Sequence, residues 1–81
     1  MNIEIYNIHL NITEADLRRL FRPFGEVATV DLKRDKWNNR STGHALVNMP
    51  IAKQALTAIL TLHGIVLAGK TLVVTEFNSN E

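Results

Sequence analysis

A short polar segment of this chain combines a tryptophan with four cationic side chains. Trp37 is the only tryptophan in the sequence, and the cations around it are Lys33, Arg34, Lys36 and Arg40. An indole ring stacks on a nucleobase and cations neutralise phosphates, so this segment has the groups that hold a single-stranded nucleic acid. An exposed tryptophan is equally suited to anchoring a protein partner. We expect the segment to be a loop, which offers no core in which to bury the indole.

Three more rings stand in segments where polar and apolar residues alternate. Tyr6, His44 and Phe77 each occupy the place of a strand residue that points away from the core. Aromatic rings on an open sheet stack on nucleobases, and a histidine can also donate a hydrogen bond. The alternative for Tyr6 is packing against a neighbouring strand, and for Phe77 it is a lid over the core or a place in the tail. The sequence alone leaves these alternatives open.

The same alternation predicts four strands that carry these rings. The strands are expected at residues 3–8, 27–33, 42–49 and 71–77. In the third, one face consists of Gly43, Ala45, Val47 and Met49, and the other of Thr42, His44, Leu46 and Asn48. The glycine and the alanine keep the first face thin, so bulky neighbours can lie close against it. On the opposite face Leu46 adds apolar area but no ring for stacking.

Two helices are expected to cover one face of these strands. The first begins at Thr13, an N-cap residue followed by acidic residues, and ends at Pro23 and the turn at Gly25. Its apolar stripe is Leu17, Leu20, Phe21 and Phe24. The second begins at Pro50 and ends at Gly64. Its apolar stripe is Ala52, Ala55, Leu56, Ile59 and Leu62.

The resulting order, β-α-β-β-α-β, predicts an α+β fold of the ferredoxin-like type, a four-stranded antiparallel sheet packed on two helices. The whole chain resembles an RNA recognition motif. The segment T-G-H-A-L-V-N-M is similar to the octamer of that family, K/R-G-F/Y-G/A-F-V-x-F/Y, at Gly43, Ala45 and Val47. Residues 3–8 occupy the place of the family's shorter motif. The spacing across the loop before residue 42 is similar to that of small stand-alone bacterial members.

The resemblance implies that the open sheet face binds single-stranded RNA by stacking bases on rings of the two central strands. The stacking positions are degenerate, because Glu4, His44 and Leu46 stand where the family has aromatic rings. Thr42 likewise stands where a basic residue is expected. A carboxylate at position 4 repels phosphate. Either it is a solvated residue paired with His44 or Lys33, or it selects a base edge or a basic partner.

Composition argues against several other classes of protein. With 81 residues, 46% hydrophobic and 21% charged, we expect one globular domain at residues 1–77 and a disordered tail at 78–81. The chain has no cysteine and no signal-peptide or membrane-spanning pattern, which favours a cytoplasmic location. Its net charge of +1 says little about partners. Because His9, His44 and His63 lack ligand-like spacing and no nucleophile–base pair is visible, we expect no metal, no cofactor, no small-molecule substrate and no enzyme activity.

The sequence therefore predicts a weak or atypical binding module for single-stranded RNA or single-stranded DNA. It would use the open sheet face and the loop between the second and third strands. The residues expected to form the site are Tyr6, Lys33, Arg34, Lys36, Trp37, Arg40, His44, Leu46, Thr75 and Phe77. The alternative is a protein–protein interaction or homodimerisation module that uses an apolar patch on the same face, which Leu46 favours.

Overall fold

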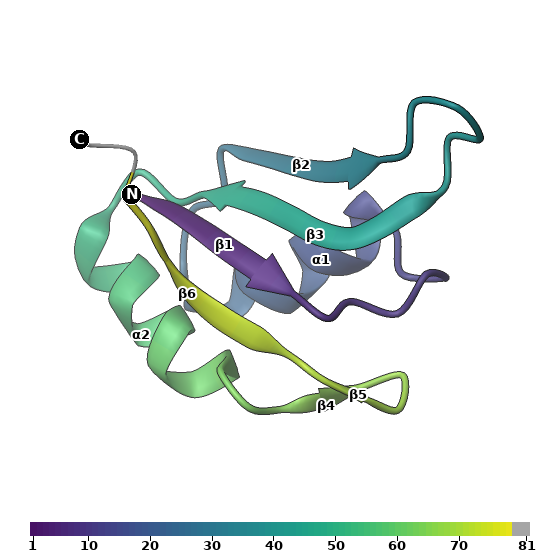
Figure 1. The fold of residues 1–81 in the computed structure, drawn as a ribbon. Coiled ribbons are helices and arrows are strands. Elements are labelled where there is room, and N and C mark those ends of the chain that lie inside the picture. The colour runs from purple at the N-terminus through teal and green to yellow at the C-terminus, as the bar shows by residue number, and fades with distance from the viewer. Residues whose placement is uncertain (79–81) are drawn as a thin grey trace.

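The computed structural model describes residues 1–78 as a sheet with helices on one face. Its elements are β1 (Asn2–Tyr6), α1 (Glu14–Phe21), the 3-10 helix η1 (Arg22–Phe24), β2 (Thr29–Arg34), β3 (Ser41–Asn48), α2 (Ala52–Leu62), β4 (Val66–Leu67), β5 (Lys70–Thr71) and β6 (Val73–Phe77). The antiparallel sheet has the order β2-β3-β1-β6, and β4 and β5 form a separate hairpin. Figure 1 shows both helices behind the sheet, whose other face is open. The predicted ferredoxin-like fold is confirmed.

The core lies between this sheet and the helices. The face of β3 that carries Ala45 and Val47 is buried, as predicted. In the pairing of β1 with β3, Ile3 lies opposite Val47 and Ile5 opposite Ala45. These residues share one apolar cluster with Phe21 of α1, which is fully buried. Burial of β-branched and aromatic side chains supplies most of the stabilisation of so small a domain. The opposite face of β1 and β3 is thereby left to solvent.

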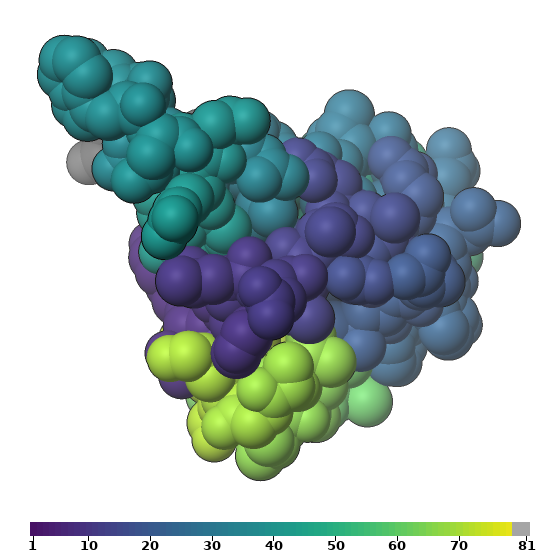
Figure 2. Space-filling view, turned by 90° about the vertical axis from the view of Figure 1, so that its right-hand side faces the viewer, coloured from purple at the N-terminus to yellow at the C-terminus, as the bar shows by residue number. Residues whose placement is uncertain are grey.

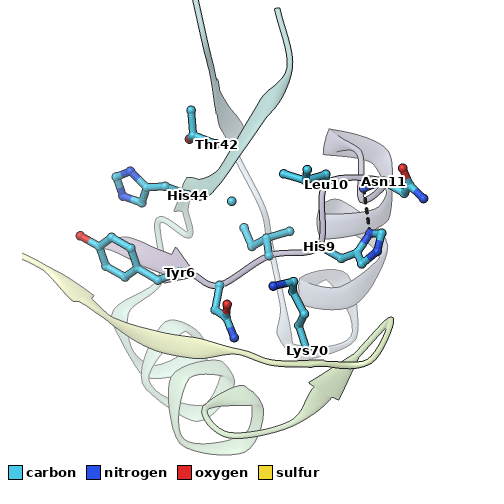
Figure 3. A pocket seen from close by; sticks show the side chains of 10 residues that line it. Tyr6, His9, Leu10, Asn11, Thr42, His44 and Lys70 are labelled. Carbon is cyan, nitrogen blue, oxygen red and sulfur yellow. Dashed lines mark hydrogen bonds between the residues drawn. The ribbon is translucent and has the colours of Figure 1, made fainter.

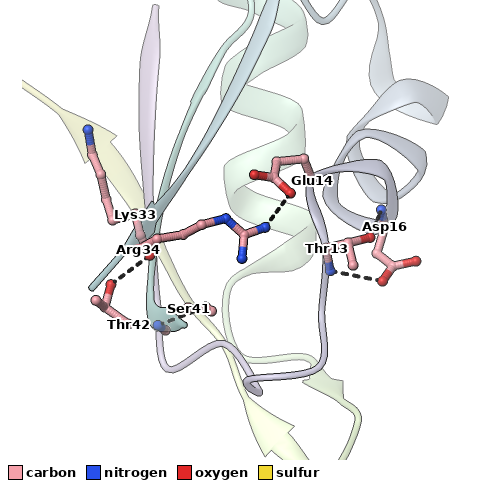
Figure 4. A network of polar contacts seen from close by, with 8 residues as sticks. Thr13, Glu14, Asp16, Lys33, Arg34, Ser41 and Thr42 are labelled. Carbon is pink, nitrogen blue, oxygen red and sulfur yellow. Dashed lines mark hydrogen bonds and ion pairs between the residues drawn. The ribbon is translucent and has the colours of Figure 1, made fainter. Parts of the chain in front are cut away.

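The start of α1 is fixed by a reciprocal pair of hydrogen bonds. The Thr13 amide donates to Asp16 Oδ2 at 3.0 Å, and the Asp16 amide donates to Thr13 Oγ1 at 3.3 Å (Figure 4). An aspartate therefore completes the capping box that usually uses glutamate. The hydrogen bond from the Thr13 backbone holds the pKa of Asp16 below its ordinary value. This cap sets where the loop between β1 and α1 ends.

The second helix begins later than predicted and buries a different stripe. It starts two residues after Pro50, and Gly64, with φ 89°, follows its C-cap as expected. The buried residues of α2 are Ala55, Ala58 and Leu62. The prediction was wrong for Ala52 and Leu56, which are exposed. Leu56 lies roughly 100° around the helix from Ala55, on the side away from Ala58 and Leu62, and so points past the sheet.

The C-terminal strand is interrupted and is preceded by a hairpin that the sequence did not predict. Leu72 separates β5 from β6, and its amide donates to the Ile65 carbonyl at 2.8 Å. The hairpin β4–β5 turns through Ala68 and Gly69, both with positive φ (53° and 83°), as a two-residue turn requires. Lys70 then projects beside the end of β1 rather than within the main sheet.

The first two strands are also shorter than predicted. β1 ends at Tyr6 because Asn7 adopts a φ of 65°, which is incompatible with a strand. β2 begins at Thr29, although Val27 is buried just before it. Of the predicted tail, Asn78 follows β6 outside any strand, and residues 79–81 lie outside the described residues. In the described part of the chain, no helix is long and apolar enough to span a membrane.

Candidate nucleic-acid interface

The open face of the sheet consists of three rows of side chains that cross the strands. In the order β2, β3, β1 and β6, they are the tyrosine row (Lys33, His44, Tyr6 and Val73), the acidic row (Asp31, Leu46, Glu4 and Thr75) and the Phe77 row (Thr29, Asn48, Asn2 and Phe77). Strand register fixes the second and third rows and pairs Tyr6 with Val73 in the first, where a ring contact joins Tyr6 to His44. Lys33 lies at an irregularity in the β2–β3 pairing and is assigned to the first row by its position two residues after Asp31. Each row therefore has its own chemistry.

The tyrosine row contains a preformed aromatic stack. The rings of Tyr6 and His44 are parallel within 1°, with centroids 4.5 Å apart. Tyr6 Oη donates to Glu4 Oε2 at 2.7 Å, and this hydrogen bond raises the pKa of Tyr6 above its ordinary value. Each ring has one face against the other, so a nucleobase has to stack on an outer face or part the pair. Tyr6 is 40% exposed and is accessible to such a base.

The same glutamate lies beside the histidine without a well-directed hydrogen bond. His44 Nε2 is 3.4 Å from Glu4 Oε2, yet this buried nitrogen has no hydrogen-bond partner among the described residues. We interpret the contact as an electrostatic one that strengthens when the imidazole is protonated. Of the two partners expected for Glu4, His44 is thus its neighbour, while Lys33 pairs with Asp31 at 2.6 Å.

The acidic row lacks an aromatic ring and carries two carboxylates, Glu4 on a central strand and Asp31 on the edge strand β2. Leu46 lies between Asp31 and Glu4 in the strand register, and Glu4 faces Thr75 on its other side. A phosphate that crosses this row meets negative charge, and a base that crosses it meets no ring on which to stack. The centre of the face is consequently the part least suited to a nucleic acid.

The loop between β2 and β3 presents its tryptophan to solvent. The Asp35 amide donates to the Arg40 carbonyl at 2.7 Å, and the Asp35 side chain accepts the Trp37 amide at 2.7 Å. Trp37 is 87% exposed, and Lys36 Nζ lies 5.8 Å from its ring centroid. Figure 2 shows this loop projecting from the body of the molecule. The predicted exposure of the indole is confirmed, on a loop that hydrogen bonds hold in shape.

The four cations around this loop fall into two kinds. Lys33 pairs with Asp31 on the open face, whereas Arg34 reaches to the helix side and binds Glu14 at 2.8 Å (Figure 4). The backbone at the start of α1 and then Arg34 hold the pKa of Glu14 below its ordinary value. Within residues 1–78, Lys36 and Arg40 form no ion pair. These two can therefore bind phosphate without giving up a carboxylate partner.

Comparison with known proteins identifies the family. The family model described as "RNA recognition motif" matches residues 3–73 of this chain. The chain belongs to the RNA recognition motif family. It is 34% identical over 72 residues to the human protein named probable RNA-binding protein 23, which is 89% of this chain and 16% of that protein. The chain therefore spans about a sixth of this curated relative.

Two solved structures of RNA-binding proteins are similar to this RNA recognition motif over almost its whole length. The crystal structure of RNA Binding Protein PG1 has a TM-score of 0.95 at 30% identity, covering 100% of this chain and 98% of that chain. The structure titled Sxl-lethal protein/RNA complex has a TM-score of 0.93 at 28% identity, covering 99% of this chain and 48% of that chain. Both likenesses include the four-stranded sheet described above.

This RNA recognition motif does not gather all of the predicted site residues in one place. Phe77 pairs with Asn2, four residues along β1 from Tyr6, which is about 13 Å in a strand. Leu46 and Thr75 belong to the acidic row between them. Tyr6 and His44 stack at the other end of the face, and Lys33 lies near the end of β2, shortly before the β2–β3 loop. The predicted rings of the sheet face are thus divided, with Tyr6 and His44 at one end, Phe77 at the other and the acidic row between them.

A pocket that the sequence did not predict lies at the end of β1 in this RNA recognition motif. It has a volume of about 610 Å³ and is lined by Tyr6 and His44, by residues 7–11, by Thr42 and Gly43 and by Lys70. Figure 3 shows Tyr6 and His44 on one side of it and Leu10 on the other, with the Lys70 ammonium pointing inward. No periodicity marks these loop residues. In the described part of the chain, no group of side chains is placed to hold a metal ion.

Proposed function

We propose that this RNA recognition motif binds single-stranded RNA at the tyrosine row and the neighbouring β2–β3 loop. The observation that carries the proposal is the Tyr6–His44 stack, whose Tyr6 is exposed and whose His44 lies in β3 directly after the loop that carries Lys36 and Arg40. Bases would stack on the outer faces of the rings, and the two cations would bind phosphates. Single-stranded DNA is expected to occupy the same groups, because base stacking and phosphate contacts do not require a 2′-hydroxyl.

We further propose that the binding is weak and atypical for the family. Degenerate stacking positions support this, since the acidic row has a carboxylate and a leucine where rings would stack. The absence of each ring lowers the binding free energy available from base stacking by roughly 1–3 kcal/mol. The short β2–β3 loop supports assignment to the small stand-alone bacterial type. Lys33 and Arg34 contribute less than Lys36 and Arg40 in this proposal, because each has a carboxylate partner.

The emission of Trp37, the sole tryptophan, tests the proposal directly. Short single-stranded RNA should quench it in a saturable way that high salt reverses. Each neutralised phosphate contributes a slope of roughly −0.7 in log K against log salt, so Lys36→Ala with Arg40→Ala should flatten the slope by about one unit or more. Lys53→Ala, on the distant helix α2, is the matched control and should leave the slope as it is.

An unchanged slope in the double variant would remove the loop from the RNA contact. The alternative function, protein interaction or homodimerisation, predicts a different response from the same indole. RNA would then have no effect, and the emission would shift to the blue as the protein concentration rises, because Trp37 leaves water on association. The exposure of Trp37, together with exposed Tyr6 and Val73 on the sheet face, is the observation that favours this second function.

A further inference from the structure

We propose that the pocket at the end of β1 binds one nucleotide of the RNA strand, so that the strand leaves the sheet there instead of crossing the acidic row. This inference rests on the proposed function, because the nucleotide would follow the one stacked on Tyr6 and His44. The pocket shares these two rings with the tyrosine row and is continuous with it. Its volume of about 610 Å³ lies in the range of ligand-binding pockets and accommodates a nucleotide.

The pocket is held open by hydrogen bonds between the segments that form it. The Ile8 amide donates to the Gly43 carbonyl at 3.0 Å, which fastens the β1–α1 loop to β3. Asn7 Nδ2 donates to the Thr71 carbonyl at 2.8 Å, which fastens the end of β1 to β5. Within the loop, the Asn11 amide donates to His9 Nδ1 at 3.0 Å. A ligand therefore does not have to order these walls, which lowers the entropic cost of binding.

Gly43 has a particular part in this construction. Its φ of 83° is one that side-chain-bearing residues rarely adopt, and a Cβ there would lie 3.1 Å from the Ile8 carbonyl oxygen. Any other residue here would be strained, and its Cβ would crowd the loop at Ile8. The same octamer position that resembles the family therefore also shapes the floor of the pocket.

The lining offers both an apolar surface and polar groups of the kind that a nucleotide needs. Leu10 is 58% exposed, and the face of a base would cover it. Lys70 is the one lining residue with a permanent charge, and its ammonium points into the pocket (Figure 3). Asn7 keeps its amide oxygen and one N–H for a base edge after its bond to Thr71. The lining contains no carboxylate, in contrast to the acidic row.

A second hollow gives the strand a path beyond the pocket. Leu10 and Asn11 line the pocket and also a hollow that contains Arg34 and Arg40. Figure 2 faces this end of the molecule, where the β1–α1 loop lies between the β2–β3 loop and the β4–β5 hairpin. An RNA strand that passes over Leu10 would therefore have the Lys70 ammonium beside it on one side of this residue and the Arg40 guanidinium on the other. Positive charge follows this route, whereas negative charge lies across the centre of the sheet.

Strand length separates the pocket from the stack experimentally. Dissociation constants would be measured by amide shift titration with random-sequence RNA dinucleotides and hexanucleotides. A dinucleotide can be held by the Tyr6–His44 stack and the cations of the β2–β3 loop. A hexanucleotide is long enough to enter the pocket as well. Leu10→Asp puts a carboxylate at the rim, and we expect it to weaken hexanucleotide binding roughly tenfold while changing dinucleotide binding little. Lys70→Ala should flatten the hexanucleotide salt slope by about 0.7.

Both substituted side chains are exposed, so the variants should fold, and Lys53→Ala controls for the loss of one positive charge. Tyr6→Ala distinguishes a failure of this inference from a failure of the proposed function. Suppose that Tyr6→Ala weakens binding, but that Leu10→Asp and Lys70→Ala change dinucleotide and hexanucleotide binding equally or change neither. The pocket is then not a nucleotide site. If Tyr6→Ala also has no effect, RNA does not use the stack, and both proposals are wrong.

Discussion

A variant with Glu4→Tyr and Leu46→Phe is expected to bind single-stranded RNA well over tenfold more tightly than the parent. Both residues lie in the acidic row and face each other across β1 and β3, so two rings would be added at the centre of the sheet. Stacking on one ring contributes roughly 1–3 kcal/mol. The change also removes a carboxylate that repels phosphate. Tyr6 loses the acceptor of its hydroxyl, but this group is exposed and water replaces it.

Fluorescence titration with one RNA pool at a fixed salt concentration would measure the effect. Glu4→Gln is the control that removes the charge without adding a ring, and we expect it to tighten binding only a few-fold. The difference between the two variants isolates stacking from electrostatics. A double variant that binds no better than the parent would show that RNA does not contact the acidic row even when rings are present there.

Tyr6→Ala is expected to weaken RNA binding by roughly 5- to 150-fold, which corresponds to about 1–3 kcal/mol for one stacked base. The phenol is the larger ring of the stack and has an accessible outer face. Phe77→Ala is a matched control, because it removes a ring from the same sheet face about 13 Å away along the strand. We expect that variant to change binding much less.

The two rings of the stack should also behave as one unit. His44→Ala and Tyr6→Ala each remove the partner that holds the other ring in place, since the rings are parallel and in contact. The double variant should therefore lose less binding free energy than the sum of the single losses. Equal effects of Tyr6→Ala and Phe77→Ala would instead mean that the strand lies along the whole sheet, and additive losses would mean that the rings bind separate bases.

The alternation of residues was sufficient to predict the sheet and most of its buried face. In β3 the pattern of small and apolar residues corresponds to the buried face, and β1 places Ile3 and Ile5 beside it. The start of α1 at Thr13 was also predictable, because a capping box depends only on neighbours in the sequence. The stripe of α2 was not, since Ala58 rather than Leu56 is buried, a choice that depends on how close the sheet lies.

The arrangement of the site required long-range information. Which cations are free depends on the pairs Arg34–Glu14 and Lys33–Asp31, and the first joins residues on different elements. The Tyr6–His44 stack depends on the pairing of β1 with β3, which composition does not specify. The pocket is formed by the β1–α1 loop, the start of β3 and the β4–β5 hairpin. Only the turn of that hairpin, at Gly69, had a signal in the sequence. Sequence therefore predicted the rings but not their grouping.

Amide chemical-shift mapping with a short single-stranded RNA pool tests most directly whether RNA binds at the tyrosine row. We expect the largest shifts at Tyr6, His44 and their neighbours in β1 and β3, with smaller shifts in the β2–β3 loop and little change at Phe77. Shifts concentrated on the outer face of α2, around the exposed Leu56 and Leu60, would contradict it. So would a titration in which Tyr6 and His44 do not respond at saturating RNA.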